Sequence, residues 1–236
     1  MRKAITEFDL IQDGDKIAVG VSGGKDSLVL LMGLIRLRQF IGIDYDITAL
    51  TIDPRFGSNE TDYSPVANLC KEYGVTHVIE KTDIGSIVFD IRKESNPCSL
   101  CANMRRGALN SKAKELGCNK VALGHHYNDV VETFMMNLFI EGRIGCFSPK
   151  TYLDRSDITI IRPLVFAPER EIKNAARRNN IEIVKSECPA DGVTKRQEMK
   201  DFLREREHDD KGFTDRIFGA LRRSGVDGWG FKEGSQ

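Results

Sequence analysis

The sequence predicts an α/β fold with a doubly wound, mostly parallel sheet of about five strands and additional helices at its C-terminal end. Two observations lead to this. Short β-branched or apolar runs alternate along the chain with longer segments of helical spacing, an order typical of parallel sheets. The length of 236 residues also suits one such domain. We therefore expect a single domain over residues 1–236, with a helical extension that begins near residue 194.

The first half of the chain alternates strongly. Residues 16–21 form the first expected strand, and the apolar run 28–37 is too long for a strand, so it predicts a buried helix. Glycines at 74 and 117 close two of the later helices in the way that helix C-caps commonly do. The elements expected after the first helix are strands at 47–52, 75–80 and 120–123, and helices at 61–73 and 101–116.

The second half is less regular. Residues 141–157 contain Gly and Pro without a clear period, which predicts a mobile loop. Residues 225–236 are rich in glycine, so we expect a frayed tail. The regular elements expected here are helices at 129–140 and 168–178, strands at 158–161 and 181–184, and a polar helical region from 194 to 223.

Composition excludes several classes of protein. No apolar run approaches the roughly 18–20 residues that a membrane-spanning helix needs, and the N-terminus lacks the apolar stretch of a signal peptide. Six cysteines without such a signal predict reduced thiols in a cytoplasmic protein, some of which can be metal ligands. Lys plus Arg and Asp plus Glu both number 35, so any RNA-binding site must be local.

Residues 22–27 read Ser-Gly-Gly-Lys-Asp-Ser and lie between the first strand and the first helix. At such a junction the backbone N–H groups and the helix dipole favour an anion, so the segment predicts a phosphate-binding loop. A plain strand-to-helix turn is the alternative. The spacing matches neither a Walker A loop nor the GxGxxG dinucleotide motif. The residues expected to contact phosphate are Ser22, Gly23, Gly24, Lys25, Asp26 and Ser27, with Asp26 also a candidate Mg²⁺ ligand.

This segment resembles the PP-loop ATP pyrophosphatases, whose fold is of the adenine nucleotide alpha hydrolase type. The resemblance implies that ATP is cleaved between its α and β phosphates and that AMP is transferred to a carbonyl or amide oxygen. It also implies catalytic roles for Lys25 and Asp26. By the same analogy Asp53, at the end of the second strand, would lie near the adenosine. The alternative is that Asp53 is a turn residue before Pro54.

The segment 124–133 reads Gly-His-His-Tyr-Asn-Asp-Val-Val-Glu-Thr and follows the fourth expected strand, at the sheet edge where such folds bind ligands. It resembles the GHHxDDxxET element of the tRNA-modifying PP-loop branch, with Asn128 in place of an Asp. The resemblance implies that Gly124 and His125 bind ATP and that Asp129 is catalytic. Asp129 and Glu132, at i and i+3, could instead reflect helix capping, with Asn128 or Asp129 as the N-cap.

Cys98 and Cys101 open an expected helix, where the helix dipole lowers thiol pKa values and favours metal binding. Cys188 follows the last expected strand, so all three thiols can meet at one edge of the sheet. They predict a three-cysteine metal site, whose alternatives are zinc and disulfide chemistry. The remaining cysteines are expected to be ordinary thiols: Cys70, Cys118 and Cys146.

The cysteine pattern narrows the resemblance to the TtcA group, the tRNA 2-thiocytidine synthetases. Its matches are residues 97–109 (PCSLCANMRRGAL), 124–133 and 160–164 (IIRPL), and the late cysteine. The resemblance implies a 4Fe-4S cluster on Cys98, Cys101 and Cys188, with one iron open to sulfide. Known members carry a second CxxC at the late position, where this chain has Cys188 alone.

The resemblance to this group implies ATP- and Mg²⁺-dependent 2-thiolation of cytidine 32 in tRNA, with sulfur from a cysteine desulfurase or sulfide, by a homodimer. Three alternatives remain: another tRNA pyrimidine, small-molecule amidation, and a nucleotide-binding regulator without turnover. Basic residues that could meet tRNA, or simply face solvent, gather mainly in the second half. They are Arg105, Arg106, Arg177, Arg178, Lys195, Arg196, Lys200, Arg204, Arg206, Arg216, Arg222 and Arg223.

Overall fold

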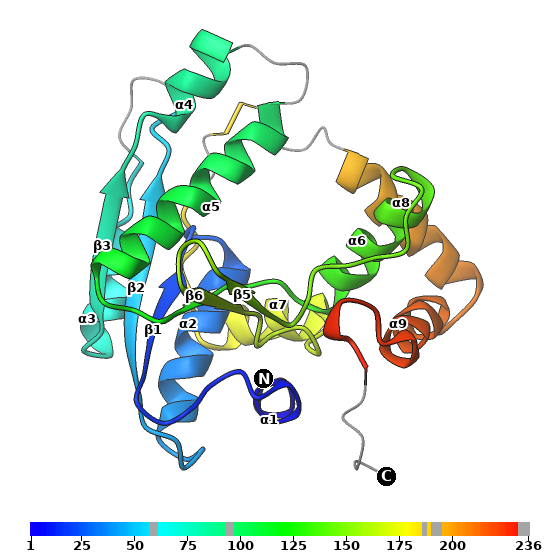
Figure 1. Ribbon diagram of the computed structural model, residues 1–236, viewed down its shortest axis with the longest axis horizontal. Coiled ribbons are helices and arrows are strands. Elements are labelled where there is room, and N and C mark those ends of the chain that lie inside the picture. The colour runs from blue at the N-terminus through cyan, green and yellow to red at the C-terminus, as the bar shows by residue number, and fades with distance from the viewer. Residues whose placement is uncertain (57–60, 93–96, 186–187, 190–194, 231–236) are drawn as a thin grey trace.

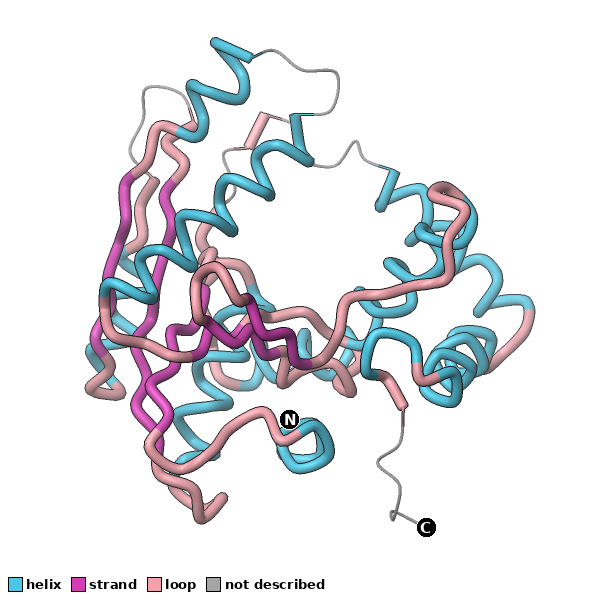
Figure 2. Tube along the Cα trace, viewed as in Figure 1, coloured by secondary structure: helices cyan, strands magenta, loops and turns pink. Residues whose placement is uncertain are grey.

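The computed structural model describes residues 1–56, 61–92, 97–185, 188–189 and 195–230. Its centre is a six-stranded sheet with the strand order β3-β2-β1-β4-β6-β5 (Figures 1 and 2). Neighbouring strands are parallel except β5, which is antiparallel to β6. The strands are β1 (Asp15–Gly20), β2 (Tyr45–Asp53), β3 (Thr76–Lys81), β4 (Lys120–Ala122), β5 (Lys150–Leu153) and β6 (Ile158–Ile161).

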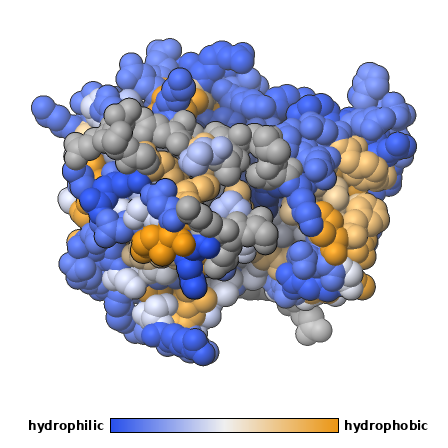
Figure 3. All heavy atoms as spheres, turned by 90° about the horizontal axis from the view of Figure 1, so that it is seen from above, coloured by the Kyte–Doolittle hydropathy of each residue, from blue (hydrophilic) through white to orange (hydrophobic). Residues whose placement is uncertain are grey.

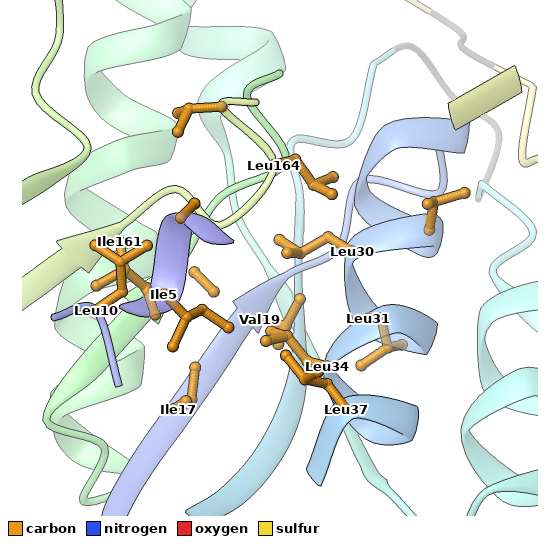
Figure 4. Close-up of a cluster of buried hydrophobic side chains, with 14 of the residues drawn as sticks. Ile5, Leu10, Ile17, Val19, Leu30, Leu31, Leu34, Leu37, Ile161 and Leu164 are labelled. Atoms are coloured by element: carbon orange, nitrogen blue, oxygen red, sulfur yellow. The ribbon is translucent and has the colours of Figure 1, made fainter. Parts of the chain in front are cut away.

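Alternate residues of β1 point to opposite faces of the sheet, and helices cover both faces. Ile17 and Val19 belong to the main core cluster, which includes residues of α1 (Arg2–Phe8), α2 (Lys25–Arg38), α3 (Ser64–Glu72) and α7 (Glu169–Arg178) (Figure 4). Ala18 lies in the second cluster, beside residues of α5. The prediction of a doubly wound α/β fold is therefore confirmed. The helical elements of the second face are α4 (Ile84–Ser86), the π-helical turn η1 (Ile87–Arg92) and α5 (Pro97–Glu115).

The C-terminal helices form a third apolar cluster against α6 (Tyr127–Phe139). Val131 and Met135 of α6 contact Met199 and Leu203 there. Beyond the cluster the chain ends in a 3-10 turn. The helical elements of the extension are α8 (Lys195–Asp209), α9 (Phe213–Ser224) and η2 (Val226–Gly228). No helix in the described part of the chain is long and apolar enough to cross a membrane.

Two expectations for the second half are wrong. Residues 150–153, placed in a mobile loop, form β5, and residues 181–184, expected as a strand, are not in the sheet. The physical reason is competition for one edge: β5 pairs with β6 from Lys150–Ile161 to Leu153–Ile158. That hairpin occupies the free side of β6, where a strand following α7 would otherwise pair, and the β-branched run 181–184 instead contacts the loop after β1.

The expectation of a frayed tail is also wrong for its first part. Trp229 is fully buried, and its Nε1 donates a hydrogen bond to the carbonyl of Phe147 (2.9 Å). Its ring meets Phe8 and Phe218 edge-on. A large aromatic side chain that finds an apolar pocket and a partner for its N–H outweighs the flexibility of neighbouring glycines. Residues 231–236 lie outside the described residues.

The order of the strands places the functional loops together. The chain runs from β1 outward to β2 and β3 on one side, and then crosses to β4 and β6 on the other. Open α/β sheets bind ligands at such a switch point, outside the carboxyl ends of the strands. The loop after β1 (residues 21–24) and the loop after β4 (residues 123–126) flank this point.

Candidate nucleotide and cysteine site

The loop after β1 is held by its own side chains. Ser27 Oγ accepts a hydrogen bond from the N–H of Ser22 (3.2 Å) and donates one to the carbonyl of Gly24 (2.9 Å). Gly24 is the N-cap of α2, and no side chain caps that helix end. The first N–H groups of α2 are therefore available to an anion, as the sequence pattern predicts.

Gly23 is required at its position for two reasons. Its φ of 82° lies in the left-handed region, and an added Cβ would lie 2.5 Å from Cβ of Val184. The N–H of Val184 donates to the Gly23 carbonyl (3.0 Å). The run 181–184 thus supports the loop from outside.

The loop after β4 begins α6 with a capping box, and the N-cap is His126 rather than Asn128 or Asp129. The N–H of His126 donates to Asp129 Oδ2 (2.9 Å), and the N–H of Asp129 donates to His126 Nδ1 (3.4 Å). Histidine is not among the usual N-cap residues, which explains why the sequence did not indicate it. Asn128 Oδ1 instead accepts from the backbone N–H of Glu169 (2.9 Å), which ties α6 to α7.

The two loops are in direct contact. His126 Nε2 lies 3.6 Å from Asp26 Oδ1. A Cβ added to Gly124 would lie 3.0 Å from the backbone of Asp26, so only glycine lets the loops approach this closely. Asp26 Oδ1 is buried and has no hydrogen-bond partner among the described residues. An unpaired buried carboxylate oxygen is a natural ligand for a hard cation.

A cavity of about 450 Å³ opens beside these loops. Its size is typical of sites for small-molecule ligands. One wall comes from α5, which the sequence did not link to the nucleotide site. The predicted site residues that line it are Ser22, Asp26, Ser27, Gly124, His125 and Asp129, and they are joined by Ala102, Arg105, Arg106, Leu109, Asn110 and Arg196.

Lys25, Gly23, Gly24 and Asp53 are not among the residues that line this cavity. Lys25 Nζ is paired with Asp26 Oδ2 (3.0 Å) and with Glu169 Oε1 (3.2 Å). Although burial lowers the pKa of Lys25, these two carboxylates raise it above its ordinary value. Asp53 Oδ1 accepts a hydrogen bond from the N–H of Arg55 (3.0 Å). This is the turn role that the sequence allows as the alternative to an adenosine contact.

Glu169, at the start of α7, is a charged centre that sequence reasoning missed. Its carboxylate pairs with Lys25, Lys173 (3.2 Å) and Lys200 (3.3 Å). Burial alone would raise the pKa of Glu169, but the hydrogen bond from Lys25 and the charges of Lys200 and Lys25 lower it to about 2. No sequence pattern indicated this centre, because the lysines that pair with Glu169 come from three different helices, α2, α7 and α8.

His125 lines the cavity as a neutral ring. Its ring centroid lies 4.9 Å from that of Phe147, and its buried Nδ1 has no hydrogen-bond partner among the described residues. Burial lowers the pKa of His125 to about 3, and the positive charges of Arg162 and Arg196 act in the same direction. At neutral pH the imidazole therefore offers a donor and an acceptor without a charge.

Arg196, from the first turn of α8, meets the acidic face of α6. Its guanidinium donates to Asp129 Oδ1 and to Thr133 Oγ1, both at 3.1 Å, and lies 3.6 Å from Glu132 Oε2. Burial, followed by the charge of Asp129, raises the pKa of Glu132 to about 7, and Arg196 opposes the shift. Because Arg196 is 67 residues away from Asp129 in the chain, no local pattern could reveal this contact.

The three predicted metal-ligating cysteines are brought together. Burial raises the pKa of Cys101, and nearby Cys188 and Cys98 raise it further, while Arg105 lowers it. The segment 188–189 lies beside the N-terminal end of α5 (Figure 1). The expected lowering of the Cys101 pKa by the helix dipole is therefore wrong, because burial outweighs it.

The described residues contain no group of three or more His, Cys, Asp or Glu side chains arranged to hold a single metal ion. Cys98 is exposed, Cys101 is buried and Cys188 is partly buried. The helix that begins with this cysteine group continues as one wall of the cavity, through Arg105 and Arg106. One helix therefore connects the thiols to the phosphate loop across the switch point.

Comparisons with known proteins agree with this geometry. The family described as PP-loop domain matches residues 1–207. A tRNA-cytidine(32) 2-sulfurtransferase of Geobacter sulfurreducens is 40% identical over 222 residues, covering 93% of this chain and 86% of its own. A protein with the same name from Syntrophotalea carbinolica is 41% identical, covering 93% and 85%.

Solved structures give a similar result. The U34-tRNA thiolase NcsA from Methanococcus maripaludis, with its 4Fe-4S cluster, superposes with a TM-score of 0.76 at 28% identity, covering 94% of this chain and 76% of its own. The NH3-dependent NAD synthetase of Campylobacter jejuni has a TM-score of 0.51 at 16% identity, covering 96% and 90%, and shares the fold.

Proposed function

The chain belongs to the tRNA-cytidine(32) 2-sulfurtransferase family of PP-loop proteins, and from this premise we propose that it replaces O2 of cytidine 32 in tRNA with sulfur, using ATP. ATP would adenylate O2 and release pyrophosphate. Sulfide would then attack C2, and AMP would leave with the former O2. Adenylation is needed because the oxygen of a pyrimidine carbonyl is otherwise a poor leaving group.

One observation carries this proposal. The cavity at the switch point has the phosphate loop on one wall and α5 on the other, and α5 begins with Cys98 and Cys101. A site that only bound a nucleotide would not need three thiols near it. A site that joins ATP activation to sulfur delivery needs both, at two ends of one cavity.

The residues of this chain have distinct parts in the proposed reaction. The free N–H groups at the start of α2, with Ser22 and Ser27, hold the phosphates. Neutral His125 donates or accepts a hydrogen bond at the cavity wall without adding charge. Asp129, held in place by the capping box and by Arg196, orients the base.

Mg²⁺ fits the donor set at Asp26. Its buried Oδ1 has no hydrogen-bond partner among the described residues, and hard carboxylate oxygens suit this ion. We assign Asp26 as the protein ligand of a Mg²⁺ ion that neutralises phosphate charge. Lys25 would act indirectly, because its ion pair with Asp26 Oδ2 holds the carboxylate in position for the ion.

We assign Cys98, Cys101 and Cys188 as the ligands of a 4Fe-4S cluster. Soft thiolates favour such a cluster, and three thiols are fewer than the four ligands that structural zinc takes. When bound, such a cluster would hold the external sulfide that displaces AMP. NcsA, the structural neighbour described above, contains a 4Fe-4S cluster. The sulfur itself would come from free sulfide or from a cysteine desulfurase.

A homodimer is the proposed assembly, and tRNA is the proposed macromolecular substrate. The described surface seen from above is mostly hydrophilic, with an apolar area on the side where α6 and α8 lie (Figure 3). The end of α6 exposes apolar side chains that a second copy could bury: Leu138, Phe139, Ile140 and Ile144. Light scattering of the purified chain distinguishes one copy from two.

The direct test is thiolation of an unmodified tRNA transcript under anaerobic conditions, with ATP, Mg²⁺, sulfide and reconstituted protein. Nucleoside mass spectrometry should detect 2-thiocytidine, and a transcript with uridine at position 32 should give none. Thiolation of another pyrimidine would redirect the proposal to that base. Pyrophosphate release without a thiolated nucleoside would contradict sulfur transfer.

Cysteine variants test the cluster half of the site separately from the nucleotide half. Cys98→Ala, Cys101→Ala and Cys188→Ala should each abolish the visible absorption of the reconstituted cluster and the thiolation. Cys118→Ala, at a buried thiol outside the group, is the matched control and should keep both. Colourless wild-type protein with stoichiometric zinc would contradict the cluster and leave the adenylation half standing.

A further inference from the structure

The lysine of the phosphate loop does not face the cavity. Lys25, the lysine of the loop, is held by Asp26 and Glu169 and does not line the cavity. Two carboxylates, Asp26 and Asp129, do line it. A nucleoside triphosphate is strongly anionic, so cations other than Lys25 must balance its charge: the Mg²⁺ assigned to Asp26 and side chains of the cavity wall.

Three cations line the cavity among the described residues: Arg105, Arg106 and Arg196. The first two belong to α5, which forms the cysteine side of the cavity. Arg196 belongs to α8 and contacts Asp129 and Thr133 of α6.

A short chain of contacts links Arg196 to the phosphate loop. Asp26 Oδ1 lies 3.6 Å from His126 Nε2. His126 and Asp129 are the two members of the capping box, and Asp129 Oδ1 accepts from Arg196 at 3.1 Å. Arg196 is therefore the cavity-lining cation that this chain of contacts links to the phosphate loop.

The guanidinium of Arg196 is also suited to bind an anion. Its hydrogen bonds to Asp129 and Thr133 leave further N–H donors, and its side chain is 44% exposed. Planar guanidinium groups bind phosphate with two parallel hydrogen bonds. The bond to Thr133 fixes the plane of the guanidinium before a ligand arrives.

We propose that Arg196 is a nucleotide-binding residue of the ATP site, contributed by the C-terminal extension, and that it contacts the phosphates of ATP. This inference rests on the proposed function, since it concerns the same nucleotide. It assigns to α8 a part in ATP binding that the phosphate loop cannot fulfil with Lys25 turned toward α7. The extension is then a component of the active site as well as a cover for α6.

The segment that leads to Arg196 supports this assignment. Val184 hydrogen-bonds the phosphate loop at Gly23, Cys188 lies in the cysteine group, and Arg196 reaches the cavity. Three described residues near the start of the extension thus contact the loop, the cysteine group and the acidic face of α6.

The test is calorimetric binding of α,β-methylene-ATP with Mg²⁺, and of adenosine, to the full chain. Arg196→Gln should raise the Kd of α,β-methylene-ATP by about tenfold or more, the loss of hydrogen bonds to a charged group. The Kd of adenosine should not change, because adenosine has no phosphate. Arg196→Lys, which keeps the charge but not the planar fork, should fall between the two.

Arg204→Gln is the matched control. Arg204 lies on the same helix, pairs with Asp201 (3.0 Å) and does not line the cavity, so both affinities should remain as in the wild type. An unchanged Kd for α,β-methylene-ATP in Arg196→Gln, or an equal loss for adenosine, would overturn the inference. Should Arg196→Gln not fold, the comparison of Arg196→Lys with Arg204→Gln decides. A wild-type chain that binds no α,β-methylene-ATP would instead overturn the proposed function.

Discussion

Glu132 and Glu169 are two carboxyl groups near the site whose pKa values move in opposite directions. Glu132 is buried beside Asp129, so its charged form is disfavoured and its pKa rises to about 7. Glu169 is also partly buried, but three lysines surround it, so its charged form is favoured and its pKa falls to about 2. The difference lies in the partners and not in the type of residue.

Glu132→Gln should stabilise the protein at pH 8. The folded-state pKa of about 7 lies above the ordinary value of 4.5, so stability is lost as the pH rises from 4.5 to above 7. A neutral amide avoids this loss, and we expect a gain of roughly 1–3 kcal/mol in the free energy of unfolding at pH 8. Urea unfolding at pH 5 and pH 8 measures it. A gain of the same size at both values would show that Glu132 does not titrate in this range.

Glu169→Gln should have the opposite effect. Its folded pKa of about 2 lies below the ordinary 4.5, so the carboxylate contributes stability above pH 4.5 that disappears as the pH falls toward 2. The variant should lose roughly 1–3 kcal/mol at pH 7 and progressively less at lower pH. Glu205→Gln, at an exposed position of α8, is the control and should be neutral. Equal losses at pH 7 and pH 3 would argue against a paired carboxylate.

At the scale of elements, the site depends on how closely two loops and one helix approach one another. The loop after β1 and the loop after β4 touch at Gly124, and α5 closes the cavity on the other side. Neither loop is covered by a long side chain at this contact. The distance between the loops is therefore set by backbone atoms, which cannot move aside as a flexible side chain would.

Gly124→Ala should weaken nucleotide binding. The new methyl group would lie 3.0 Å from the backbone of Asp26 and push the phosphate loop away from α6. Such overpacking costs about 1–3 kcal/mol, which corresponds to a rise in the Kd of α,β-methylene-ATP of roughly fivefold to above a hundredfold. Gly107→Ala, where a Cβ meets nothing within 4 Å, is the matched control and should bind normally. Normal binding by both variants would mean that the loops tolerate separation.

At the scale of the whole molecule, the two ends of the chain are joined. Arg222 of α9 is buried, forms an ion pair with Glu7 of α1, and lies over the ring of Phe166 at 4.9 Å. It is therefore not one of the solvent-facing cations that the sequence suggested for tRNA. Trp229 adds a second link between the tail and α1 through Phe8.

Trp229→Ala should destabilise the whole domain. Removing a fully buried tryptophan costs about 3–5 kcal/mol, so the urea midpoint should fall strongly. Phe40→Ala, at a side chain that is 67% exposed, should change the stability little. If Trp229→Ala left the midpoint unchanged, the tail would contribute nothing to the fold.

The sequence by itself determined the alternation of strands and helices, the phosphate loop at 22–27 and the grouping of Cys98 and Cys101. These features are local: hydrophobic period, glycine spacing and cysteine spacing can be read within a few residues. Three of the six predicted phosphate-loop residues line the cavity together with Gly124, His125 and Asp129, because both loops follow strands whose carboxyl ends share one edge of the sheet.

Only the tertiary structure decided which partner each charged or edge-forming residue takes. β5 displaced residues 181–184 because one sheet edge accepts one strand. Lys25 turned to Glu169, and Arg196 came to Asp129 from 67 residues away. Burial raised the pKa of Cys101 against the helix dipole. These outcomes depend on distances and burial between segments far apart in the chain, which no local spacing encodes.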